Sequence, residues 1–147
     1  MASRLVGRGL HLDLITEIVP VELADSCWLS IIYNLSSSFI VDQYQVQELV
    51  QDGRLLNISS ISVTIDYLPR VDLELPFERV KNRSESAVFH FGQPLLKPFS
   101  ISLPLHLRSH LPLSSDGDGF RQVSIEEPLL AEWCLAGLSF SSLLPAS

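Results

Sequence analysis

Two histidines, His106 and His110, have the spacing closest to that of a reactive or metal-binding site. On a helix, side chains four residues apart share one face and could hold a metal ion together. These two lie between Pro104 and Pro112, however, in an alternating segment that favours an extended chain with His106, Arg108 and His110 on one face. A cation between two imidazoles works against metal binding. We therefore predict no metal site but a polar strand face, which either pairs with acidic residues or forms a contact surface.

Acidic residues are the second place where chemistry could reside. Asp116 and Asp118, each followed by glycine, resemble part of a calcium loop, but the further oxygen ligands and the closing glutamate are missing. Asp72 and Glu74 share one face of an alternating segment without an acid–base partner. We expect a tight turn at 116–119, and we predict no metal ion, no cofactor and no catalytic residue.

A hydrolase is the enzymatic alternative. It would require His106 or His110 to lie within about 3 Å of a nucleophile, with a carboxylate orienting the imidazole. The chain contains neither a Gly-x-Ser-x-Gly turn nor a phosphate-binding glycine loop. The sequence alone therefore favours a protein that binds over one that catalyses.

The asparagines of the chain carry a different signal. Asn34, Asn57 and Asn82 each begin an Asn-x-Ser triplet without proline at the middle position. Such triplets accept N-linked glycan when they are exposed to the enzymes of the secretory lumen. We predict a domain that folds in that lumen; idle triplets in a cytosolic protein are the alternative, because the chain is rich in serine.

The chain has two cysteines, Cys27 and Cys134, and each has a tryptophan as its neighbour. A disulfide between them would close a loop of just over a hundred residues and would be worth about 4–5 kcal/mol by chain entropy. Two separate buried thiols are the alternative. We expect Trp28 and Trp133 to pack in the core around this pair and not to form a ligand platform.

Length and composition indicate a single globular domain. The 147 residues are 46% hydrophobic and 18% charged, with a net charge of −7. A chain of this length can bury a sizeable core without metal ions or several disulfides. The negative charge argues against binding to nucleic acid and against an electrostatic grip on anionic lipid.

The dominant hydrophobic period is two residues, which is typical of half-buried β-strands. It runs through residues 10–18, 60–67, 71–75, 87–91, 99–107 and 123–125. Asp116-Gly117-Asp118-Gly119 is the strongest hairpin signal between such runs. Only residues 41–50 have helical character, with Asp42 as the expected N-cap. The pattern predicts an all-β protein, an antiparallel β-sandwich of six to eight strands with at most one short helix.

The two ends of the chain lack targeting features. Residues 1–9 contain no apolar run of signal-peptide length, and the apolar tail at 135–147 is interrupted by glycine, serines and proline. A membrane-spanning helix needs about 20 apolar residues. We therefore expect a soluble chain with an N-terminal lead at 1–9, a β domain at 10–134 and an atypical tail at 135–147.

Five short segments resemble, in order, a known family. They read His-Leu-Asp-Leu-Ile at 11–15, Cys-Trp-Leu at 27–29, Phe-Ile-Val-Asp-Gln-Tyr at 39–44, Val-Asp-Leu-Glu-Leu-Pro at 71–76 and Leu-Pro-Leu-His-Leu-Arg-Ser-His at 103–110. Asp-Gly at 116–117 and then Pro-Leu-Leu at 128–130 with Cys134 continue the likeness. The family is that of PIG-X, the non-catalytic subunit of glycosylphosphatidylinositol (GPI) mannosyltransferase I, and its fungal counterparts. The likeness to the lumenal domain of these proteins covers roughly residues 11–134.

The resemblance implies an accessory subunit of the endoplasmic reticulum membrane, on its lumenal side, and not an enzyme. Proteins of this family stabilise a multi-spanning catalytic mannosyltransferase subunit, PIG-M, which adds the first mannose to the GPI-anchor precursor. The family resemblance thus implies a PIG-M-like partner for this chain. The resemblance places His106, Arg108 and His110 within a sequence motif of the family, but it does not assign them a role.

Three features depart from the family pattern. Ser109 stands where the family has tyrosine, and neither a signal peptide nor a membrane-spanning helix accompanies the domain. The tail after Cys134 is expected to be an alternative ending or the product of a truncated gene model. A soluble β-sandwich binding module unrelated to GPI synthesis is the alternative interpretation, and retention with a polytopic membrane partner would distinguish the two.

Overall fold

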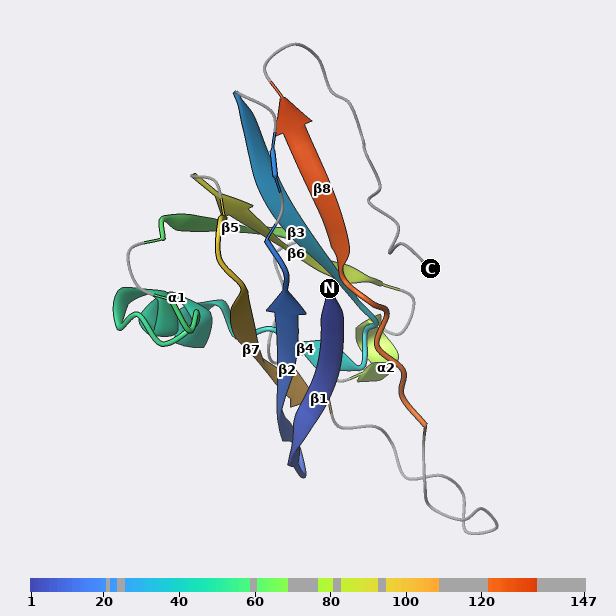
Figure 1. Ribbon diagram of the computed structural model, residues 1–147. Coiled ribbons are helices and arrows are strands. Elements are labelled where there is room, and N and C mark those ends of the chain that lie inside the picture. Colours follow the sequence, from blue (N-terminus) through green and yellow to red (C-terminus); the bar gives the residue numbers. More distant parts are fainter. Residues whose placement is uncertain are drawn as a thin grey trace, which may run out of the picture.

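The computed structural model describes residues 1–20, 22–23, 26–58, 61–68, 77–80, 83–92, 95–108 and 122–134. Within these residues the chain forms eight strands and two helices (Figure 1). In chain order they are β1 (Ala2–Arg8), β2 (His11–Ile18), β3 (Cys27–Leu35), β4 (Phe39–Ile40), α1 (Gln43–Gln51), β5 (Val63–Leu68), α2 (Phe77–Val80), β6 (Glu85–Phe91), β7 (Phe99–Leu107) and β8 (Leu129–Cys134).

The strands form two four-stranded sheets. One has the order β1-β2-β7-β4 and the other the order β5-β6-β3-β8, and every pairing between neighbouring strands is antiparallel. This arrangement confirms the predicted all-β class and the antiparallel sandwich. The β1–β2 hairpin and the β3–β8 pair reach toward opposite ends of the molecule (Figure 1).

Alternation of side chains explains why these segments are strands. In β2, Leu14, Thr16 and Ile18 are buried, whereas Asp13 and Glu17 are exposed. The same pattern holds along β7, where alternate residues from Phe99 to Leu105 are buried. One face of each sheet is therefore apolar and packs against the other sheet.

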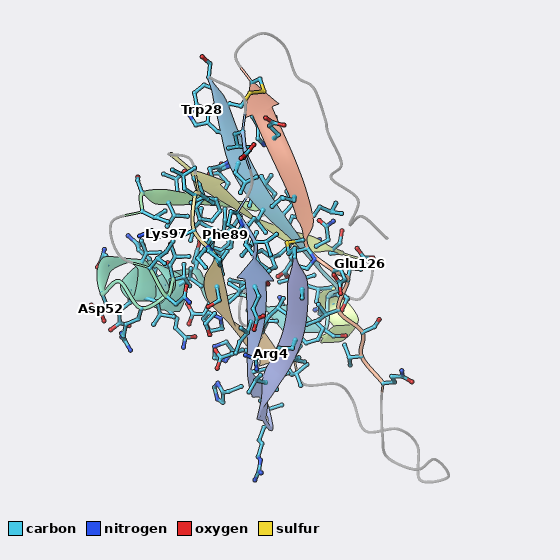
Figure 2. The ribbon with its side chains drawn as sticks, in the orientation of Figure 1. Arg4, Trp28, Asp52, Phe89, Lys97 and Glu126 are labelled. Atoms are coloured by element: carbon cyan, nitrogen blue, oxygen red, sulfur yellow. A yellow bond between two sulfur atoms is a disulfide. The ribbon has the colours of Figure 1, made fainter. Side chains whose placement is uncertain are left out.

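Aromatic side chains fill the space between the sheets. Phe91 of β6 meets Phe99 of β7 edge to face, with ring centroids 5.4 Å apart, and so joins the two sheets. Tyr33 and Phe89, neighbours within the second sheet, pack in the same manner at 5.2 Å. Figure 2 shows Phe89 in the crowded interior and Trp28 at one end of β3. Burial of these rings and of the leucine and isoleucine residues around them supplies the main stabilisation.

Helix α1 begins where the sequence predicts. The Asp42 carboxylate accepts hydrogen bonds from the backbone N–H groups of Tyr44 (2.9 Å) and Gln45 (3.2 Å), which satisfies donors that have no partner within the helix. Val46 faces the core and is fully buried. A second helix, α2, is a single turn long. Of the helices in the described residues, neither is long and apolar enough to cross a membrane.

The secondary structure differs from the sequence-based expectations at residues 1–9 and 123–125. The lead predicted at residues 1–9 contains β1, which pairs along its length with β2. Residues 122–128 form no strand, so the strand predicted at 123–125 is wrong; Val123 and Ile125 instead pack as partly buried side chains against the core. The strand predicted at 71–75, the hairpin at 116–119 and the tail at 135–147 lie outside the described residues.

Candidate functional site

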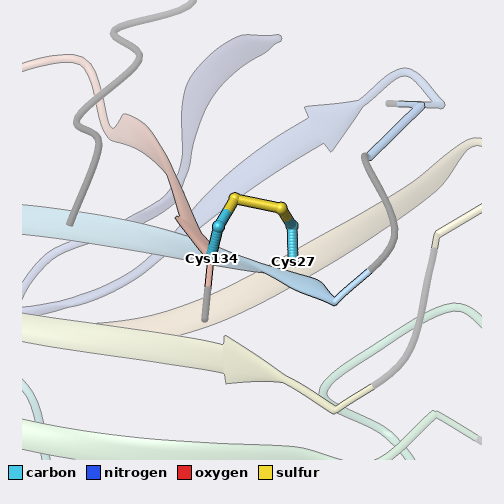
Figure 3. The surroundings of a disulfide bond; sticks show 2 residues. All are labelled: Cys27 and Cys134. Atoms are coloured by element: carbon cyan, nitrogen blue, oxygen red, sulfur yellow. A yellow bond between two sulfur atoms is a disulfide. The ribbon is translucent and has the colours of Figure 1, made fainter. Parts of the chain in front are cut away.

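The two cysteines face each other across the β3–β8 pair (Figure 3). Their sulfurs are bonded at 2.05 Å, their Cα atoms are 4.1 Å apart, and 107 residues separate them in sequence. Cys27 is the first residue of β3 and Cys134 is the last residue of β8. The antiparallel register of the two strands places these residues directly opposite each other. The bridge therefore fastens the edge strand β8 to the centre of its sheet.

Within the described residues, one group of side chains has the types and spacing of a metal site. It consists of Cys27, Glu132 and Cys134, whose ligand atoms lie within 4.8 Å of one another. A thiol binds metal as the thiolate. The disulfide leaves neither sulfur as a thiolate, so this group does not offer a metal site in the bridged form.

The predicted contact face of His106, Arg108 and His110 is only partly assembled. His106 is half-buried, with Nε2 3.0 Å from Gln45 Oε1 of α1 and its ring edge-on to that of His11 at 4.6 Å. Arg108 points inward instead of lying beside His106, because β7 ends at Leu107 and the alternation stops there. His110 lies outside the described residues. Arg108 must therefore be removed from the predicted surface.

Arg108 forms a buried ion pair with Glu85 of β6. Its Nη2 donates to Glu85 Oε1 at 3.0 Å, and the two side chains are only 1% and 9% exposed. Burial raises the pKa of the Glu85 carboxyl above its usual value, and the hydrogen bond and charge of Arg108 oppose that rise. The backbone N–H of Arg108 also donates to Ser38 O at 2.8 Å. Arg108 thus ties the end of β7 to the opposite sheet.

The strand register provides a different polar surface next to His106. Arg8, His11 and His106 lie directly opposite one another across β1, β2 and β7. Arg8 and His11 are exposed. Sequence reasoning missed this row because its members lie far apart along the chain and only the sheet brings them together.

A second polar cluster, which the sequence did not reveal, lies on the outer face of the other sheet. Ser30 Oγ is 2.8 Å from His90 Nδ1, and His90 Nε2 is 3.3 Å from Asp66 Oδ2. These are the residue types of a hydrolytic triad. Ser30 is 0% exposed, however, so its hydroxyl cannot reach a substrate in this conformation. Each residue comes from a different strand, and no local motif marks the set.

The expectation that Trp28 and Trp133 pack in the core is wrong. Trp28 and Trp133 occupy facing positions on β3 and β8, one step along from the disulfide. Successive residues of a strand point to opposite faces, so these side chains lie on the side of the sheet away from that of the cysteines. Trp28 is 40% exposed.

Two of the three glycosylation candidates lie within the described residues. Asn34 Oδ1 accepts a hydrogen bond from Ser86 Oγ at 2.9 Å, and Asn57 Oδ1 accepts one from the backbone N–H of Ser100 at 2.7 Å. In both side chains it is the oxygen that is held, and a glycan would be attached to the amide nitrogen. Asn57 is exposed and Asn34 half-buried, while Asn82 lies outside the described residues.

We expect the protein made in animal cells to carry N-linked glycan at Asn57. Because the Asn57 side chain is exposed, it remains accessible to the transferase as the chain folds. Endoglycosidase treatment should increase electrophoretic mobility, and Asn57→Gln should remove one step of that shift. Gln47→Asn, a change at an exposed position of α1 that creates no new triplet, serves as the control. An unshifted wild-type band would contradict the prediction.

Comparison with known protein families gives a match over most of the chain. The model of the PIG-X / PBN1 family matches residues 7–142. No curated protein and no solved structure matches the chain.

Proposed function

Because the chain belongs to the PIG-X / PBN1 family, we propose that it is a non-catalytic subunit that stabilises the mannosyltransferase of GPI-anchor synthesis. The family is linked to an accessory function in that enzyme. The partner would be a multi-spanning catalytic subunit of the PIG-M kind, which adds the first mannose to the GPI precursor. The observation that carries this proposal is the family match over residues 7–142.

The architecture is compatible with a supporting role. The described residues form a two-sheet body with a continuous apolar core, and the Ser30–His90–Asp66 cluster has its hydroxyl buried. A rigid sandwich can present a large fixed surface to a neighbour without reorganising on binding. Such pre-organisation suits a subunit that holds another protein in its folded form.

The proposed location is the lumenal side of the endoplasmic reticulum membrane. A Cys27–Cys134 disulfide is favoured in that oxidising compartment and disfavoured in the cytosol. The Asn-x-Ser triplets at Asn34 and Asn57 are consistent with the same location. Membrane association would come through the partner.

We further propose the Arg8–His11–His106 row as part of the surface that contacts the partner. This row replaces the predicted His106–Arg108–His110 face, because Arg108 is buried against Glu85. Arg8 and His11 are exposed and can change without disturbing the core. Exposed Leu10 lies at the tip of the same hairpin and adds an apolar contact beside them.

We expect the chain, expressed in cells with the multi-spanning mannosyltransferase subunit, to co-purify with it in mild detergent and to raise its steady-state level. The double substitution Arg8→Ala/His11→Ala should lower the recovered partner several-fold, because truncating contact residues weakens an interface mainly through faster dissociation. The melting temperature of the chain should not change.

Arg54→Ala is the matched control, since Arg54 is an exposed arginine whose ion pair is with Asp52 near the end of α1. It should leave co-purification unchanged. Failure of the wild-type chain to co-purify with the partner or to raise its level would reject the scaffold role and favour an unrelated binding module. Normal co-purification of the double variant would reject only the proposed surface.

A further inference from the structure

A groove of about 410 Å³ crosses the outer face of the β5-β6-β3-β8 sheet at its disulfide end. It lies on the side of the sheet away from the core. Its lining residues are Trp28, Ser30, Ser62, Thr64, His90, Phe91, Gly92 and Trp133. The rings of Trp28 on β3 and Trp133 on β8 border the groove on one side. The hydroxyl groups of Ser62, which directly precedes β5, and of Thr64 in β5 border it on the other side.

The aromatic side of the groove is built by strand register. Trp28 and Trp133 are opposite each other on neighbouring strands, and the adjacent Cys27–Cys134 bond holds those strands together. Trp28 lies near the end of β3 (Figure 2) and leaves 40% of its surface open to solvent. The face of an indole ring carries partial negative charge and attracts C–H groups that are partly positive.

The lining of the groove is mostly apolar, and its polar groups lie on the side opposite the tryptophans. Ser62 and Thr64 are exposed and point outward, and the Asp66 side chain, next on the same face, is 72% exposed. His90 lies between the two sides, where Ser30 Oγ at Nδ1 and Asp66 Oδ2 at Nε2 fix its ring. These groups offer several hydrogen-bond donors and acceptors within a short span.

We propose that this groove binds a neutral hexopyranose ring, as a free sugar or as part of a glycan. One face of such a ring presents C–H groups that suit the Trp28 ring, and its edge presents hydroxyls that suit Ser62 and Thr64. The Asp66 carboxylate lies outside the lining but next to His90, and its charge disfavours an anionic ligand. An aliphatic chain would contact the tryptophans but would displace water from the polar side without replacing its hydrogen bonds.

The proposal does not depend on the scaffold function. It concerns the sheet β5-β6-β3-β8, whereas the proposed partner contact lies on β1, β2 and β7. Loss of sugar binding should leave co-purification intact, and loss of co-purification should leave sugar binding intact. An experiment can therefore reject sugar binding by the groove without rejecting the scaffold function, and the reverse also holds.

Titration of the ¹⁵N-labelled, disulfide-bonded chain with methyl α-mannopyranoside and, separately, methyl α-glucopyranoside tests the proposal. We expect saturable shifts of the indole N–H signals of Trp28 and Trp133 and of β5 amides, with a dissociation constant of about 1–10 mM for a single ring. Trp28→Ala should weaken binding at least about tenfold. Ser62→Ala/Thr64→Val, which alters only exposed hydroxyls, should weaken it independently of any effect on folding.

Tyr44→Ala is the matched control, because Tyr44 is an exposed aromatic residue on α1. It should bind the sugars as the wild type does. Absence of saturable shifts with either sugar, or shifts that persist unchanged in both groove variants, would overturn the proposal. Saturable shifts at the same signals with n-hexanol and none with the sugars would also overturn it and would identify the groove as an apolar contact.

Discussion

Substituting serine for both Cys27 and Cys134 should lower the free energy of unfolding by about 4–5 kcal/mol. The bridge closes a loop of 107 residues and so lowers the conformational entropy of the unfolded chain. Removing the bridge restores that entropy and thereby stabilises the unfolded state relative to the folded one. It also frees the edge strand β8, whose strand pairing is with β3 alone among the described strands. Urea denaturation of the oxidised wild type and of the variant measures the difference.

The reductant dependence separates the bridge from the packing of its two residues. Dithiothreitol should shift the denaturation midpoint of the wild type toward that of the double variant and should leave the variant unchanged. Each single variant, Cys27→Ser or Cys134→Ser, should resemble the double variant, since either change abolishes the bond. Equal midpoints for oxidised wild type and double variant would show that the bridge does not stabilise the fold.

The elements that sequence predicts best are those whose signal is local. The alternation along 99–107 coincides with β7, and that along 10–18 contains β2. Asp42 was identifiable as an N-cap because its carboxylate needs only the backbone two and three residues ahead. In each case the residues that define the element also determine its structure.

Elements whose signal comes from neighbours were harder to predict. β1 has no alternating pattern, with nearly all of its residues exposed, and is a strand because β2 offers it a ladder of hydrogen bonds. β3 is the centre of its sheet, so Ser30 on its outer face is as buried as Ile31 on its inner face and the period of two disappears. Tertiary context determines both.

The polar sites show the same limit more strongly. Alternation placed Arg108 beside His106 on the surface, but the end of β7 turns it inward toward Glu85, a residue of another strand. Likewise Ser30, His90 and Asp66 come from β3, β6 and β5. Only the strand order and register bring such residues together, and a single sequence contains neither.

The Glu85–Arg108 pair should show the second large effect on stability. Removing one partner of a buried ion pair takes away the counter-charge that this partner supplied, which costs about 3–5 kcal/mol. We expect this loss for Arg108→Met, which takes from the Glu85 carboxylate its buried counter-charge, and a loss for Glu85→Leu as well, because an arginine cannot shed its proton. Urea denaturation at neutral pH gives both values.

The double substitution Glu85→Leu/Arg108→Met should recover most of the stability. Replacing both ions by apolar side chains removes the attraction between the two charges, and it also removes the free-energy cost of taking those charges out of water. Arg54→Met is the matched control. Its ion pair with Asp52 is shorter, at 2.7 Å, but the arginine side chain is 61% exposed, so the expected loss is under about 1 kcal/mol. A wild-type midpoint for Arg108→Met would contradict a structural role for the buried pair.

The pH dependence provides a separate test of the role of the Glu85 carboxyl. Burial raises the pKa of Glu85 in the folded chain, so the folded state binds its proton more tightly than the unfolded state does. The contribution of this group to stability is therefore greatest below the ordinary carboxyl range and is lost as pH rises through the folded pKa. Arg108→Met removes the interaction that opposes the rise, so the pKa of Glu85 should rise further and the variant should regain stability relative to wild type as pH falls. Glu85→Leu has no such proton to bind, and its deficit should lack this recovery; parallel recovery in both variants would exclude Glu85 as the titrating group.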